Sequence, residues 1–215
     1  MTGSSSDTAN AYTIVINSAD AAIANVADLN TIDTATSVAV DASEVTSMTG
    51  TASALNTLYT AASNGTVTGI NAQETTILSD TASTSAAQVH TLKNTMDALA
   101  AAQSPAVTPA NINAASVTSF SGVALDTLAV YSAGNTGRIT GLGAEDIIID
   151  ESGSGGDGAL SVHDANLLDT YSTGVITATI QENDSTTLAT LTNTTTTGVI
   201  DNTQDRHAYT ITITN

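Results

Sequence analysis

The sequence predicts an α/β repeat fold, an irregular solenoid of about six strand–helix coils with a β-rich C-terminal part. Three observations predict it: one stretch of sequence occurs twice, short β-rich runs alternate with short helical patterns, and large aliphatic residues are few but periodic. Each coil of a solenoid contacts only its neighbours, so a thin core of small side chains is sufficient.

The repeated stretch is residues 41–74, which aligns without a gap on residues 113–146, 72 positions later. Twelve of the 34 aligned pairs are identical. Both copies carry a Gly-x-β-Thr-Gly-aliphatic segment, at 65–70 and 137–142. The first glycine suits the end of a helix and the second suits a turn into the next segment.

Composition excludes several classes of function. Among 215 residues there are only 3 Lys and Arg against 21 Asp and Glu, a net charge of -18. Such a chain lacks the basic surface needed for nucleic acid or an anionic membrane. No apolar run reaches 18 residues, so we expect no membrane insertion. Cysteine is absent, so no disulfide is predicted and the redox compartment stays open.

The N-terminal residues 1–11 are rich in Ser, Gly and Thr and lack the features of a secretory signal peptide. We expect them to be disordered, and we expect the chain to be a segment of a longer protein. Residues 12–173 are predicted to form the solenoid. Its first coil is a strand at 12–16, a helix capped by Ser18 and extending to 32, and a strand at 37–40.

Between the two copies, apolar residues recur every three or four positions and predict a helix over 80–102, capped by Asp80. Pro105 and Pro109 end it and leave room for a β run around Val107. After the second copy we expect a buried strand at 147–149 and a helix at 160–171. Five leucines mark the helices of successive coils: Leu29, Leu55, Leu92, Leu125 and Leu168.

Residues 174–215 are predicted to be β-rich, since apolar residues alternate with Thr in four runs. These runs are 175–180, 186–191, 198–200 and 208–214. Alternating Thr is typical of the outer face of a half-buried strand. The alternative, a flat Thr array that orders water, would need the same pattern on every coil.

An acidic Gly/Ser loop follows the second copy and is the candidate calcium site. Its oxygen ligands would come from Asp146, Asp150, Glu151 and Asp157, because Ca²⁺ takes six to eight hard ligands. The segment 153–161 resembles, once and imperfectly, a calcium-binding nonapeptide whose sites need stacked copies. A solvated acidic loop is the favoured interpretation, so we predict no resident cofactor and at most one or two weak Ca²⁺ sites. A second, weaker pair is Asp201 and Asp205.

No catalytic signature is present, and we predict that the chain is not an enzyme. None of His90, His163 and His207 has the spacing of a zinc-binding motif. The sequence also lacks the Gly-x-Ser-x-Gly motif of a serine nucleophile. Aromatic residues make up 3% of the chain, which leaves little surface for stacking sugars. A carbohydrate-binding or carbohydrate-active module on a solenoid scaffold stays open as the alternative.

In its repeats, 41–45, 55–61, 65–70 and their copies over 113–142, the chain resembles segments of giant, acidic, Ala/Thr/Asp-rich surface proteins of bacteria. The family includes cyanobacterial proteins, one of them associated with swimming without flagella. The resemblance implies an adhesin-like structural module that is secreted or held at the cell surface. The expected partners are adjacent repeats of the same protein, a second copy end to end, and a surface polysaccharide.

Overall fold

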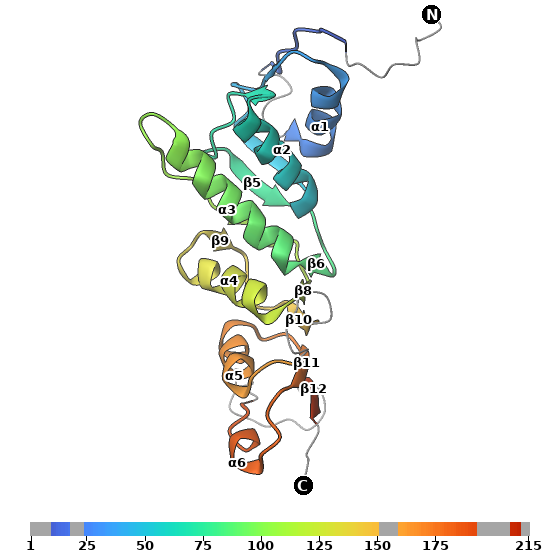
Figure 1. Cartoon of the computed structure of the whole chain (residues 1–215), viewed down its shortest axis with the longest axis vertical. Helices are drawn as coiled ribbons and strands as arrows, with labels where there is room; N and C mark the ends of the chain where they lie inside the picture. The colour runs from blue at the N-terminus through green and yellow to red at the C-terminus, as the bar shows by residue number, and fades with distance from the viewer. Residues whose placement is uncertain (1–9, 18–23, 151–158, 193–206, 212–215) are drawn as a thin grey trace, which may run out of the picture. The chain divides into compact units, whose positions relative to one another are not determined.

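The computed structural model describes residues 10–17, 24–150, 159–192 and 207–211. The fold is α/β, with parallel strands and six helices in this part of the chain (Figure 1). The prediction of disorder for 1–11 falls almost entirely outside the described residues, as do the helix cap at Ser18 and the β run at 198–200.

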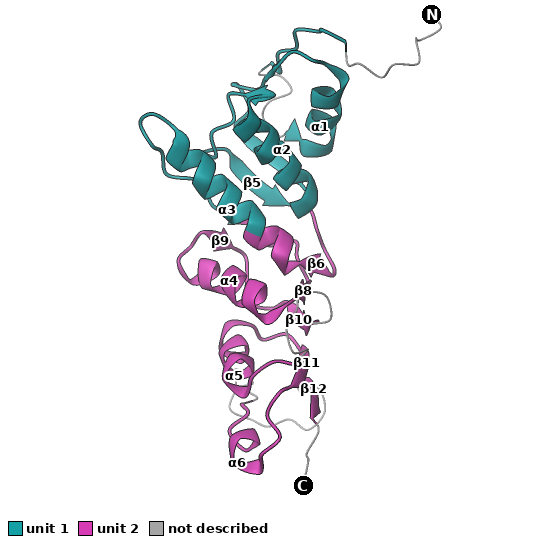
Figure 2. Ribbon diagram, in the orientation of Figure 1, with its two compact units in different colours: residues 1–78, 91–112 teal, residues 79–90, 113–215 magenta. Residues whose placement is uncertain are grey.

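The chain divides into two compact units (Figure 2). The first comprises residues 1–78 and 91–112, and the second comprises 79–90 and 113–215. The boundary passes through a single helix, α3, which spans Ala86–Ala102. The predicted division into a solenoid at 12–173 and a β-rich part at 174–215 stays a prediction.

In the first unit, each of two helices directly follows a strand. α1 (Val26–Ala35) follows β1 (Ala24–Asn25), and α2 (Ala52–Asn64) follows β3 (Ser47–Gly50). β3 pairs in parallel with both β1 and β5, and a second parallel pair joins β2 to β4. The bounds of these last strands are Val40–Asp41 for β2, Val67–Thr68 for β4 and Thr75–Leu78 for β5.

The second unit contains a parallel sheet in the order β12-β11-β10-β8-β6. Its helices likewise follow strands or, for α5, the bridged residue Leu160. The backbone N–H of Ala114 donates to the Thr140 carbonyl at 2.8 Å. The helices are α4 (Ala124–Asn135), α5 (Val162–Tyr171) and α6 (Ser185–Leu188). The strands are β6 (Thr84–Ser85), β8 (Ser119–Gly122), β9 (Ile139–Thr140), β10 (Asp146–Ile149), β11 (Ile176–Ile180) and β12 (Ala208–Ile211). β7 (Ile112–Asn113) has one residue in each unit.

The repeat in sequence is also a repeat in structure. Four elements of the first copy recur 72 positions later, namely β2 as β7, β3 as β8, α2 as α4 and β4 as β9. The fifth pair is out of step by one residue, because β5 begins at Thr75 whereas β10 begins at Asp146. This shift changes which carboxylate is buried at the end of each copy.

In each copy a glycine after the short strand β4 or β9 lies against the turn that follows the first strand of that copy, β2 or β7. The side chains of Asp41 and Asn113 shape those turns by accepting hydrogen bonds from the N–H groups two residues on, both at 3.0 Å. A Cβ on Gly69 would lie 2.3 Å from the Cα of Ser43, and the φ of Gly69 is +87°. Only glycine combines this backbone conformation with so close an approach.

Helix starts are the main local difference from the predictions. α3 begins at Ala86, six residues after Asp80, because Thr84 and Ser85 pair with β8. The Ser85 hydroxyl accepts a hydrogen bond from the Gln88 N–H at 3.3 Å. No strand is described around Val107. The predicted strand at 12–16 is reduced to an isolated bridge between Val15 and Asp41.

One further prediction is wrong for a local reason. The run 186–191 is not a strand, because Asp184 caps a one-turn helix, α6, by accepting from the N–H groups of Thr186 and Thr187. Leu125 is 75% exposed. The buried counterpart of Leu55 in the second copy is Thr127, whose hydroxyl donates to the Val123 carbonyl.

Candidate functional site

The predicted calcium ligands are only partly within the described chain. Asp146 and Asp150 flank the strand β10 at its two ends, and the Asp146 carboxylate accepts a hydrogen bond from the Val175 N–H at 2.8 Å. Glu151 and Asp157 lie outside the described residues, as do the second pair, Asp201 and Asp205. In the described part of the chain no three acidic or histidine side chains form a metal-binding group. Calcium binding stays a prediction.

The acidic residue that is buried in the second copy is Glu145, near its end, which is 3% exposed. Its carboxylate accepts hydrogen bonds from the Gly143 N–H at 2.8 Å and from the Tyr131 hydroxyl at 3.1 Å. Burial first, and then the charge of Glu145, raise the pKa of Tyr131 far above its ordinary value. Tyr131 therefore acts as a fixed hydrogen-bond donor to a buried carboxylate.

The first copy buries a different carboxylate, that of Glu74, with a poorer set of partners. Its Oε1 accepts from the Asn71 N–H at 3.0 Å, but the Tyr59 hydroxyl is paired with Thr76 at 2.8 Å. Among the described residues, the Glu74 Oε2 atom has no hydrogen-bond partner although it is buried. Burial raises the pKa of Glu74, against the opposing effect of nearby backbone N–H groups. The ionised form of Glu74 is therefore a cost to folding.

We expect Glu74→Gln to stabilise the first unit at pH 7 by on the order of 1 kcal/mol, since it removes a buried charge that lacks a full set of donors. The pKa of Glu74 is raised from 4.5, so the folded state keeps the proton longer than the unfolded state does. The free energy of unfolding of the native chain thus falls as the pH rises above 4.5, and this loss is absent in the variant.

Urea unfolding followed by circular dichroism between pH 3.5 and 7.5 measures the difference. Gln73→Glu is the control, because it adds a carboxylate one residue away in the same turn and leaves Glu74 in place. A gain from Glu74→Gln that is equal at pH 3.5 and pH 7.5 would contradict the assignment.

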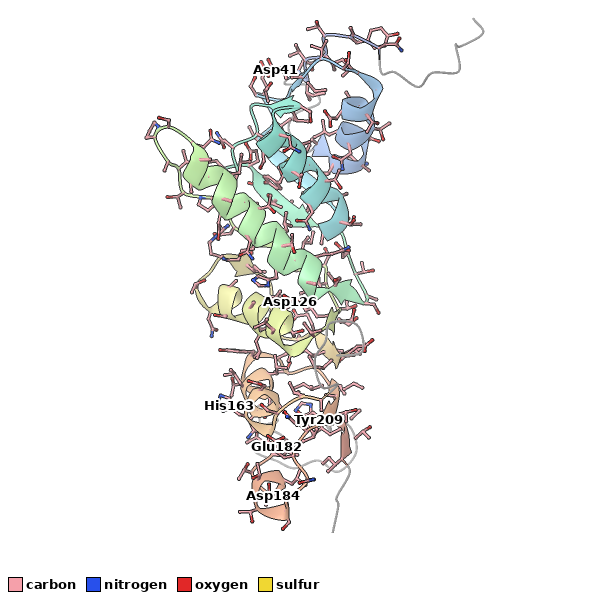
Figure 3. All side chains as sticks on the ribbon, viewed as in Figure 1. Asp41, Asp126, His163, Glu182, Asp184 and Tyr209 are labelled. Carbon is pink, nitrogen blue, oxygen red and sulfur yellow. The ribbon has the colours of Figure 1, made fainter. Side chains whose placement is uncertain are left out.

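Two of the three candidate histidines, His90 and His207, are held in structural contacts, whereas His163 is exposed at the start of α5. The Nε2 atom of His207 lies 2.8 Å from the Asp169 carboxylate, and its Nδ1 accepts from the Ile176 N–H at 3.0 Å. Tyr209, labelled in Figure 3, packs against the same ring with its centroid 5.3 Å away. With both ring nitrogens engaged, His207 has no lone pair left to act as a general base. On α3, the Nδ1 of His90 lies 2.7 Å from Asp126.

A pocket of about 310 Å³ lies at the C-terminal end of α4 in the second unit. Tyr131 and Tyr171 form one of its sides, with their rings nearly parallel, 5° apart in orientation, and their centroids 5.9 Å apart. We call this pocket the tyrosine groove. It is lined by Tyr131, Gly134, Asn135, Gly137, Ile139, Thr140, Gly141, Leu142 and Tyr171.

Sequence analysis missed the tyrosine groove. Tyr131 is visible in the alignment as the partner of Tyr59, but Tyr171 lies outside both copies. The one available signal was the helix motif at 168–172, which places Tyr171 at the end of a helix.

Comparison with protein-family models, with curated proteins and with solved structures finds no match to this chain. In the part of the chain that the structure describes, none of the helices has the length and apolar character needed to cross a bilayer.

Proposed function

We propose that this chain is a structural repeat module of a large secreted or cell-surface protein, in which each unit is a short solenoid that spaces or displays other parts. The observation that carries the proposal is the ladder of parallel pairs between successive strand–helix segments. The paired residues are separated by 24 positions for Ala24 and Met48 and by 36 for Thr84 and Phe120. Within each unit, successive strand–helix segments are therefore joined by parallel strand pairs.

Side chains at helix ends support the same arrangement. The hydroxyl of Thr36, after α1, donates to the Tyr12 carbonyl and accepts from the Val38 N–H. Ser172, after α5, does the same with the Glu145 carbonyl and the Gly174 N–H. Each hydroxyl therefore accepts a hydrogen bond from a backbone N–H of its own turn and donates one to a backbone carbonyl of the preceding segment. The same hydrogen-bonding role of Ser or Thr occurs after both helices.

The charge of -18 favours a hydrated surface and opposes non-specific association in solution, which suits an extracellular module. Its partners would be adjacent repeats of the same protein, which cover the terminal coils. Without them, a second copy stacked end to end would serve the same purpose.

Small-angle scattering of one copy and of two copies joined in tandem tests the proposal. Stacked coils extend in one direction, so we expect the maximum dimension to increase nearly twofold in the tandem protein. By contrast, a single closed globule with twice as many residues has a radius only about 1.3 times as large. The smaller increase, with the two copies in contact, would reject the solenoid module. Sedimentation of the single copy at high concentration detects end-to-end association.

A further inference from the structure

We propose that the tyrosine groove binds one unit of a neutral saccharide. This goes beyond the spacing role, since it assigns the second unit a ligand of stated chemistry. The volume, about 310 Å³, is at the lower end of the range for small-molecule sites. A groove of that size suits a single sugar ring better than a longer occupant.

The aromatic side of the groove is held rigidly. Tyr131 is 3% exposed, its hydroxyl donates to Glu145, and its ring meets Phe120 edge to face at 6.0 Å. Tyr171 stacks on this fixed ring and is itself only partly buried. An aromatic ring with a polar tip offers an apolar face at little cost in conformational entropy, which suits the C–H face of a sugar ring.

The rest of the groove is neutral and polar. Asn135 and Thr140 are exposed and contribute an amide and a hydroxyl, groups that both donate and accept hydrogen bonds as sugar hydroxyls do. No Lys or Arg lines the groove, and buried Glu145 lies behind Tyr131. With a net charge of -18 on the chain, an anionic ligand is disfavoured.

The first copy of the repeat provides an internal comparison. Ile70, the counterpart of Leu142, is 5% exposed, whereas Leu142 is partly exposed. The helix after the first copy, α3, has 17 residues, whereas α5 after the second copy has 10 and ends at Tyr171. The groove is therefore a feature of the second copy and does not follow from the repeat itself.

Affinity electrophoresis through gels containing dextran, a soluble β-glucan or a galactomannan tests the proposal. We expect at least one of these neutral polysaccharides to retard the native protein. Tyr171→Ala should weaken that retardation at least tenfold, because it removes the partly exposed ring that lines the groove. Tyr12→Ala is the matched control, since Tyr12 is 57% exposed in the first unit and lies outside the groove.

A second variant, Asn135→Ala, guards against a folding defect, because Asn135 is exposed and its loss should weaken retardation without changing the circular dichroism spectrum. Retardation by none of the three polysaccharides would overturn the proposal. So would retardation that Tyr171→Ala and Asn135→Ala leave unchanged. Shifts of the tyrosine ring signals on titration with tetramethylammonium, without any retardation, would replace the saccharide with an organic cation.

Discussion

Gly69→Ala is expected to lower the free energy of unfolding of the first unit by about 3 kcal/mol or more, which is a large effect for one methyl group. Two costs combine. The φ of +87° is unfavourable for any residue with a Cβ, and the added atom would lie 2.3 Å from the Ser43 Cα. The clash is with backbone, so no side-chain rotation relieves it. The Asx turn at Asp41 would have to move away, together with the strand pair β2 and β4.

Gly65→Ala is the matched control for this prediction. Gly65 ends α2 with a φ of +77°, but no atom lies within 4 Å of the position its Cβ would occupy. Alanine there should cost only the conformational preference, about 1–2 kcal/mol. Urea unfolding followed at 222 nm compares the two variants. Equal losses would mean that the close approach to Ser43 contributes nothing.

Tyr131→Phe is expected to lower the free energy of unfolding of the second unit by about 2–3 kcal/mol. The substitution removes the hydrogen bond from the Tyr131 hydroxyl to the carboxylate of Glu145, which is 3% exposed. The Gly143 N–H is then the donor that remains to this carboxylate. A hydrogen bond to a buried charge is worth more than one between neutral groups, since the charge cannot recover its hydration.

Tyr59→Phe is the equivalent change in the first copy. There the hydroxyl is paired with the neutral Thr76 side chain, so we expect a loss of about 1 kcal/mol. Thr76 keeps a bond to the Glu74 carbonyl at 3.2 Å, which limits the damage. Chemical denaturation of both variants at pH 7 measures the difference. A larger loss from Tyr59→Phe than from Tyr131→Phe would contradict the role given to Glu145.

Much of the fold could be predicted from the repeat. The helix at 160–171 is confirmed as α5, because its apolar spacing is clear. The strand at 147–149 is present as β10, but it is not buried throughout, since Ile148 is 39% exposed. The start of α3 could not be predicted, since Thr84 and Ser85 are suitable for either a helix or a strand. Pairing with β8, a contact distant in sequence, decides between them.

Leu125 shows the limit of matching a motif by composition. Leu125 lies in a helix as predicted, but it is exposed, and α4 instead buries Thr127, where the first copy has Leu55. A threonine in that position is tolerated because its hydroxyl bonds the Val123 carbonyl.

Little of the candidate site could be predicted. The acidic cluster seen in the sequence includes Glu145, but neither its burial nor that of Glu74 was predicted, and the two residues are not aligned in the repeat. The one-residue shift between β5 and β10 causes this, and no pattern in the sequence signals such a shift. The tyrosine groove depends on the length of α5, which the sequence gives only approximately.

The varying separation between paired strands has a consequence for how such chains diversify. Between the Ala24–Met48 pair and the Thr84–Phe120 pair the intervening chain lengthens from 24 to 36 positions while the parallel pairing is kept. Many of the additional residues lengthen the helix, since α3 has 17 residues and α1 has 10. The parallel pairing between the strands is unchanged. Insertions and deletions between strands should be nearly neutral in this architecture, so related chains can differ widely in length while retaining the same ladder.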